Sequence, residues 1–144
     1  MSGRDLKFFL ALQIFAVIWA GMVFSLIEAR VWAGALAGGY FLGAGLFMLA
    51  RIWKWPRKWK SLTLYPLFLH VFLISIPLLV SRFLQIGKDF EAVQVLGLEG
   101  PVFHRLSTMV FSALIAATLL DLVRVWRGAQ SLKSKPVQPM REIR

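Results

Sequence analysis

Four long apolar stretches, separated by short polar segments, dominate the pattern along the chain. They run from about residue 6 to 27, 31 to 50, 64 to 80 and 102 to 123. Each is close to the roughly 20 helical residues that cross a hydrocarbon core about 30 Å thick. Four strands cannot close a barrel, and lipid offers no partner to an open backbone group, so we expect helices. The pattern predicts an all-α integral membrane protein, a bundle of four transmembrane helices.

The segments between these stretches complete the predicted organisation. A continuous helix over residues 6–50 would extend about 67 Å at 1.5 Å per residue, twice the membrane, so a tight hairpin near residues 28–30 is preferred. The segment 83–101 mixes apolar and acidic residues, which predicts a short amphipathic helix on the outer membrane surface. Residues 1–127 then form one transmembrane domain. The basic tail 128–144 is predicted to be disordered and cytoplasmic.

The basic residues lie on one side of the predicted membrane. Thirteen of the 17 Lys and Arg residues precede the first span, lie between spans two and three, or follow the fourth. The positive-inside rule therefore places both termini in the cytoplasm. The net charge of +10 is read as a topology signal, and no nucleic-acid partner is predicted. We expect a multi-pass protein of a bacterial-type inner (plasma) membrane, in contact with anionic lipids on its cytoplasmic side.

The composition agrees with a membrane protein. Hydrophobic residues make up 58% and charged residues 17% of the chain, against about 45–50% and 25% in soluble domains. A chain of 144 residues has too little interior to bury that much apolar surface. The absence of Cys excludes disulfides, thiolate metal sites and cysteine nucleophiles.

Span two carries two pairs of glycines that allow close helix packing. Gly34-x3-Gly38 and Gly39-x3-Gly43 are small-x3-small patterns, which let another helix approach closely. The approaching helix belongs either to this chain, which is preferred, or to a partner subunit.

Aromatic and basic residues alternate in the loop between spans two and three. Trp53, Trp55 and Trp59 are interleaved with basic residues that include Lys58. Aromatic rings favour the headgroup level, and basic residues are attracted by an anionic leaflet. This loop is predicted to anchor the protein at the lipid interface. A docking surface for a cytoplasmic partner is the alternative.

Two ionisable residues lie clearly inside the predicted spans, and such residues are functional candidates. His70 and Asp121 are each a few residues from the cytoplasmic end of their span, His70 near 9 Å deep. The two side chains are thus expected at similar depth, where they can form a hydrogen-bonded pair with Arg124 one turn away. A structural pair that locks two helices is preferred over a proton relay.

A second histidine, His104, opens the fourth span at the outer face. His70 and His104 suggest a haem held by two histidines, but an expected separation of about 20 Å along the membrane normal argues against it. A haem on one histidine, or a copper site completed by Met109, is the alternative, and no cofactor is predicted. His104 and Arg105 are expected to form a polar cluster with Glu28, Arg82 or Glu99.

Three segments resemble the signatures of a known family. Residues 19–24 are similar to a W-x-G-x-x-F signature, residues 33–38 with Phe41 resemble an A-G-x-x-x-G opening of span two, and residues 103–107 are similar to an F-x-x-L-H-R-L-S segment. The family comprises small four-helix membrane proteins of a domain of unknown function, with eukaryotic relatives of the transmembrane protein 205 type. The resemblance implies a four-helix bundle and no established activity. The chain departs from the family in having no His before span one.

Three functions are compatible with these patterns. The preferred one is a non-enzymatic accessory or structural subunit that packs against partner membrane proteins or a second copy of itself. The second is a small haem- or metal-binding redox subunit that uses His70 or His104. The third is a proton- or ion-coupled transporter or channel, in which His70 and Asp121 line the path of an oligomer. No phosphate-binding loop, nucleophile elbow or cluster of intramembrane carboxylates indicates an enzyme.

Overall fold

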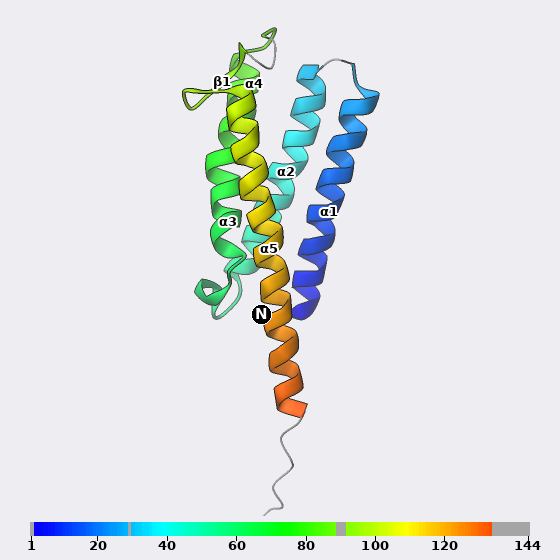
Figure 1. Cartoon of the computed structure of the whole chain (residues 1–144), viewed down its shortest axis with the longest axis vertical. Coiled ribbons are helices and arrows are strands. Elements are labelled where there is room, and N and C mark those ends of the chain that lie inside the picture. The colour runs from blue at the N-terminus through cyan, green and yellow to red at the C-terminus, as the bar shows by residue number, and fades with distance from the viewer. Residues whose placement is uncertain (1, 29, 89–91, 134–144) are drawn as a thin grey trace, which may run out of the picture.

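The computed structural model describes residues 2–28, 30–88 and 92–133, and most of them are helical. Four stretches of this part of the chain are long and apolar enough to cross a membrane, as the hydrophobic pattern predicts. The third is built from three consecutive pieces (Figure 1). The helical elements are α1 (Gly3–Leu26), α2 (Arg30–Trp53), the short 3-10 helix η1 (Lys58–Lys60), α3 (Leu64–Leu69), the π-helix η2 (His70–Ser75), α4 (Ile76–Leu84) and α5 (Gly100–Lys133).

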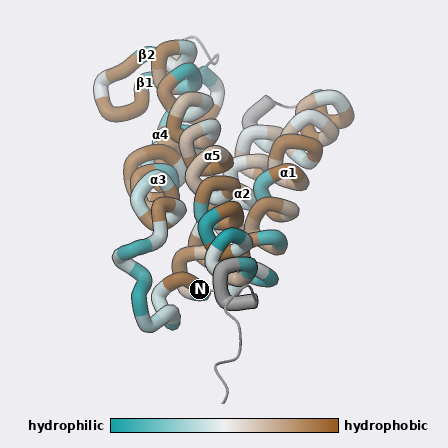
Figure 2. Tube along the Cα trace, turned by 60° about the horizontal axis from the view of Figure 1, so that its bottom comes forward, coloured by the Kyte–Doolittle hydropathy of each residue, from teal (hydrophilic) through white to brown (hydrophobic). Residues whose placement is uncertain are grey.

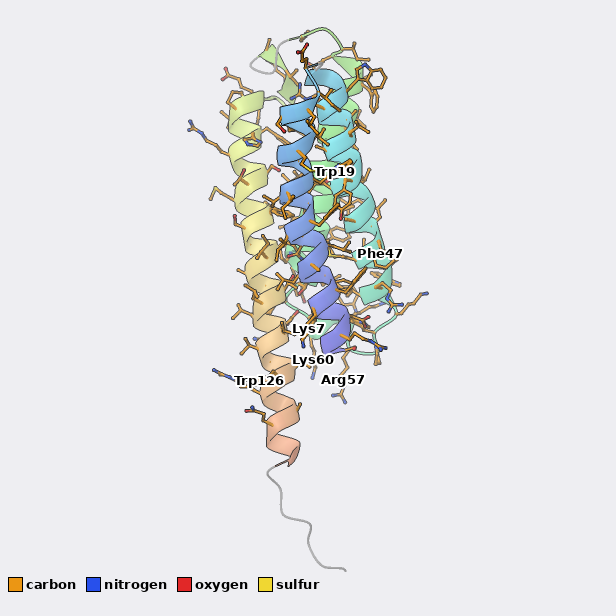
Figure 3. The ribbon with its side chains drawn as sticks, turned by 90° about the vertical axis from the view of Figure 1, so that its right-hand side faces the viewer. Lys7, Trp19, Phe47, Arg57, Lys60 and Trp126 are labelled. Atoms are coloured by element: carbon orange, nitrogen blue, oxygen red, sulfur yellow. The ribbon has the colours of Figure 1, made fainter. Side chains whose placement is uncertain are left out.

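The four helical stretches alternate in direction, so the predicted hairpin between α1 and α2 is present. The beginning of α1, the loop that contains η1 and the end of α5 lie at one end of the bundle, here called the basic end (Figure 1). Figure 3 shows Lys7, Arg57 and Lys60 together at this end. An ion pair between Arg51 Nη2 and Asp5 Oδ1, 2.8 Å long, joins α2 to α1 there.

The main core lies in the basic half of the bundle. Its buried side chains come from all four helical stretches and include Phe9, Ile52, Leu67 and Leu114, each fully buried. Hydrophobic residues predominate along the helices (Figure 2), and many of them are exposed on the outer faces. Large side chains such as Ile18 and Leu73 are more than half exposed there. Apolar surface on the outside of a bundle is what a lipid environment requires.

The two predicted glycine pairs of α2 differ in their surroundings. A Cβ added to Gly38 would lie 3.2 Å from Leu79 Cδ2 of α4, so Gly34-x3-Gly38 serves close packing within the chain. A Cβ on Gly39 or Gly43 would meet nothing within 4 Å. The preferred intramolecular interpretation therefore holds for the first pair, whereas the second pair lies on an open face.

The third helical stretch contains a π-helical segment, which the hydrophobic pattern does not predict. In η2 the backbone N–H of Ile76 donates to the carbonyl of Val71, five residues earlier. Pro77 follows directly, has no N–H to donate, and its ring crowds the carbonyl four residues before it. The wider turn accommodates this proline, as π-bulges do elsewhere.

The segment between α4 and α5 differs from the prediction. In place of an amphipathic helix over residues 83–101, α4 continues to Leu84, and the strands β1 (Gln94–Val95) and β2 (Leu98–Glu99) form an antiparallel hairpin. Leu96 and Gly97 at its turn both have positive φ, 53° and 80°, as a tight two-residue hairpin turn requires. The Gln85 side chain bonds to the Gln94 backbone through both its nitrogen and its oxygen. The hairpin caps the other end of the bundle, here called the hairpin end (Figure 1).

The predicted boundary of the C-terminal tail is also corrected. Helix α5 continues past Gly128 to Lys133, so the first residues of the predicted disordered tail are helical. Residues 134–144 lie outside the described part of the chain.

Candidate functional site in the hairpin half of the bundle

A cavity of about 480 Å³ lies between the helices in the hairpin half of the bundle. All four helical stretches contribute to its wall, which is mainly apolar. The volume falls within the range of about 300–1,000 Å³ that is typical of small-molecule sites. Since protein interiors have few voids larger than a water molecule, a space of this size between helices is a candidate site.

The cavity opens between α1 and α5. Lining residues on these two helices are exposed, with Val17 at 53% and Phe24 at 50%, and His104 on α5 is exposed too. The opposite wall is closed, since Ala37 on α2 is buried. Figure 1 shows α1 and α5 close together towards the basic end and diverging towards the hairpin end.

Two buried polar side chains form the deep end of the cavity. His70 and Ser75 of η2 are only 4% and 3% exposed, and both line the cavity. Neither ring nitrogen of His70 nor the Ser75 Oγ has a hydrogen-bond partner among the described residues. The rings of His70, Phe41 and Phe111 form one cluster, in which the His70 centroid lies 5.8 Å from that of Phe41 and 5.3 Å from that of Phe111. Buried polar groups usually have hydrogen-bond partners, so this end of the cavity is a candidate site for a polar group of a ligand.

A buried amide lies below His70, towards the basic end. Gln13 of α1 is 2% exposed and lines a second, very small void that His70 also borders. Its Nε2 donates to Thr118 Oγ1 at 2.9 Å and to the Met48 sulfur at 3.8 Å. No pattern in the sequence indicates this contact, although Gln13 is the one amide inside the first apolar stretch.

Asp121 does not pair with His70, and the predicted pair is therefore wrong. Its Oδ2 accepts hydrogen bonds from Ser61 Oγ at 2.7 Å, from the Thr63 backbone N–H at 3.0 Å and from Thr63 Oγ1 at 2.9 Å. Its Oδ1 lies 3.9 Å from Arg124 Nη1, in agreement with the expected proximity of that guanidinium. The loop before α3 folds back towards α5, so its hydroxyls reach the carboxylate while His70 faces the cavity. The sequence feature that could have indicated this contact is the presence of two hydroxyl residues, Ser61 and Thr63, just before span three at the depth of Asp121.

The residues of the predicted outer polar cluster occupy different places. Arg82 and His104 line the cavity towards the hairpin end, whereas Glu28 and Arg105 are exposed and do not line it. The mutual pairing expected of this cluster stays a prediction.

The two histidines line the same cavity, which corrects the expected separation of about 20 Å. His70 packs on Phe111, which follows His104 by two turns of α5, or about 10 Å. Depth along the membrane normal therefore does not by itself exclude a haem held by both histidines. Met109 is 70% exposed and does not line the cavity, so the structure does not support copper held by His70 and Met109. Within the described residues, no group of three or more His, Asp or Glu side chains is placed to hold a metal ion.

The aromatic loop at the basic end is only partly as predicted. Trp53 and Trp59 are exposed, and Lys58 Nζ lies 3.6 Å from the centroid of the Trp53 ring. Trp55 instead stacks on Phe9, with ring centroids 5.8 Å apart, and is half-buried against the core. Trp53 and Trp59 are thus available to a lipid headgroup layer, whereas Trp55 fixes the loop to the bundle.

The three segments that carry the family resemblance meet at the cavity. Each contributes lining residues, namely Ala20 and Phe24, Gly34 and Gly38, and Phe103 and His104. Segments from α1, α2 and α5, far apart in the sequence, thus converge on one site.

Comparison of the chain with models of known protein families, with curated protein sequences and with solved structures gives no match. The resemblance to the transmembrane protein 205 type of family stays a prediction from those segments.

Replacing Asp121 tests its structural role. We expect Asp121→Ala to lower the free energy of unfolding by about 2–4 kcal/mol, because the donors of Ser61 and Thr63 lose their buried acceptor. Asp5→Ala breaks only the partly exposed pair with Arg51 and should cost about 1 kcal/mol or less. Unfolding of the purified variants in mild detergent measures both changes. Equal losses for the two variants would contradict the assignment.

Proposed function

We propose that the chain crosses a bacterial-type inner membrane four times, with the basic end in the cytoplasm. Four apolar helices with apolar outer faces support membrane insertion. The proposed orientation rests on the 13 of 17 Lys and Arg residues that the sequence places on the side of the termini. Anionic lipid headgroups would then contact Trp53, Trp59 and Lys58.

Cysteine labelling tests this topology, because the natural chain contains no Cys. Lys88→Cys near the hairpin and Lys54→Cys in the basic loop are matched variants, since each position is exposed and each change removes one positive charge. A membrane-impermeant maleimide applied to intact spheroplasts should label position 88 and should label position 54 only after permeabilisation. The reverse pattern would show the opposite orientation.

Within this topology, the proposed function is to bind a membrane-soluble molecule that enters the cavity from the bilayer. The observation that carries the proposal is the opening between α1 and α5. Val17 at this opening lies about 21 Å along α1 from Gly3, at the depth of the hydrocarbon core. A lipid-like molecule reaches such an opening directly, whereas a water-soluble one does not. The proposed role is binding, and it requires no catalytic group.

A bulky side chain inside the cavity tests this function. Ser107 on α5 lines the cavity, whereas Ser112 on the same helix is exposed outside it. We expect Ser107→Trp to remove a small molecule that co-purifies with the protein in mild detergent, and Ser112→Trp to retain it. Native mass spectrometry measures the added mass. A bound molecule that persists in Ser107→Trp at full occupancy would overturn the proposal.

A second candidate function is that of a packing subunit, and the open face of α2 favours it. Gly39 and Gly43 leave space for a helix that this chain does not supply among its described residues. Small residues at this spacing let two helices approach closely in a membrane. The partner is another membrane protein or a second copy of the chain.

The packing function predicts a defined response to Leu at these glycines. Gly39→Leu and Gly43→Leu should abolish any oligomer or complex, while the fold tolerates both because nothing lies within 4 Å of either site. Gly21→Leu on α1 is the matched control, since its surroundings are equally open. Chemical crosslinking in the membrane followed by mass measurement reports the assembly. Unchanged assemblies in both α2 variants would contradict this function.

A further inference from the structure

The π-helix η2 determines how the polar groups at the deep end of the cavity are presented. His70 and Ser75 are five residues apart, and i to i+5 bonding places residues at that spacing nearly above one another. On an α-helix of about 3.6 residues per turn they would point to different sides. Both side chains therefore line one cavity because the turn between them is wide.

A bound molecule without polar atoms would leave His70 and Ser75 without hydrogen-bond partners. A neutral imidazole offers one donor and one acceptor, and a Ser hydroxyl can donate or accept. Both are buried without partners among the described residues, and such groups are costly to leave unpaired. The deep end of the occupant should therefore carry hydrogen-bonding atoms.

The charges along the cavity limit what these atoms can be. Apart from His70, the ionisable residues that line the cavity are Arg82 and His104, and both lie towards the hairpin end. The other lining residues from α1, α2, η2 and α5 near His70 are apolar or carry only hydroxyls. A carboxylate or phosphate at the deep end would have no Lys or Arg beside it among the described lining residues, and burying an anion without such a partner is unfavourable. A phospholipid or fatty acid with its head near Arg82 would place only a hydrocarbon end beside His70.

The rings around His70 indicate the shape of the polar group. Phe41 and Phe111 lie 5.2 Å apart in an edge-to-face arrangement, and each also contacts the His70 ring. Aromatic side chains in such arrangements favour a flat ring as a neighbour. Towards the opening, Val17 and Phe24 provide an apolar exit into lipid.

We propose that the cavity binds a membrane lipid with an uncharged, carbonyl-bearing ring as its head, of the quinone class. The ring lies against the contacting Phe41 and Phe111 side chains and its oxygens bond to His70 and Ser75, while the isoprenoid tail leaves between α1 and α5. This inference rests on the proposed function that the cavity takes up a molecule from the bilayer. It concerns binding alone and assigns no electron transfer.

The test uses the full chain, purified and stripped of bound lipid in mild detergent. The probe is a benzoquinone with a tail of two isoprenoid units, and the comparison ligands are a fatty acid of similar length and the same tail without the ring. Isothermal titration calorimetry measures the dissociation constants. We expect saturable quinone binding that is at least 10-fold tighter than binding of either comparison ligand.

Substitutions at His70 and Ser75 test whether these two residues bind the quinone. We expect His70→Leu to weaken quinone binding at least 10-fold and Ser75→Ala several-fold, because each removes a hydrogen-bonding group. His70→Gln, which keeps a donor and an acceptor, should restore most of the affinity. Ser112→Ala on the exposed face of α5 should change nothing. Ser75→Ala is a small change that keeps the test valid if His70→Leu does not fold.

The outcomes separate this inference from the proposed function. If the fatty acid binds as tightly as the quinone, is displaced by Ser107→Trp and is insensitive to Ser75→Ala, the cavity binds lipid but the ring-head assignment is wrong. A visible absorption band of a co-purified haem would overturn the assignment as well. If no ligand binds and no molecule co-purifies, the proposed function fails together with the inference. Quinone binding that is lost in Ser107→Trp and weakened in Ser75→Ala supports both.

Discussion

The closure of the basic end is the constraint on which the rest of the structure depends. There a core formed by all four helical stretches excludes solvent, and the Asp121 carboxylate connects α5 to the loop before α3 through Ser61 and Thr63. Gln13 and Thr118 add a buried hydrogen bond between α1 and α5. Buried polar contacts of this kind are costly to break, so the helices are held together firmly at one end.

The hairpin half opens between α1 and α5, because the buried core and the Gln13–Thr118 hydrogen bond that join these two helices lie on the basic side. Helix α2 remains close to α4 through Gly38 and Leu79, so the divergence appears on the side of α1 and α5. This one-sided divergence produces a cavity with a lateral opening, which a bundle packed evenly along its length would lack. The proposed function is thus a consequence of where the chain places its packing contacts.

The cavity combines an apolar wall with two polar side chains at its deep end, and this combination distinguishes it from a packing defect. A void that results from imperfect packing is lined by apolar atoms and stays dry. Here His70 and Ser75 are buried without partners among the described residues and are brought to one face by a π-helix. Segments of this kind occur frequently at functional sites. The open glycine face of α2 is separate from the cavity, so ligand binding and subunit packing are compatible in one protein.

The sequence by itself determined the number of helices, their antiparallel order and the basic end, because long apolar stretches and the positions of Lys and Arg are local properties of the chain. It also singled out His70 and Asp121, since ionisable residues stand out in apolar stretches. It did not determine their partners: Ser61 meets Asp121 across 60 residues, and His70 faces a cavity made by four helical stretches. Only the tertiary structure decided these contacts, because they depend on the rotation of each helix about its axis and on the width of the turn at η2.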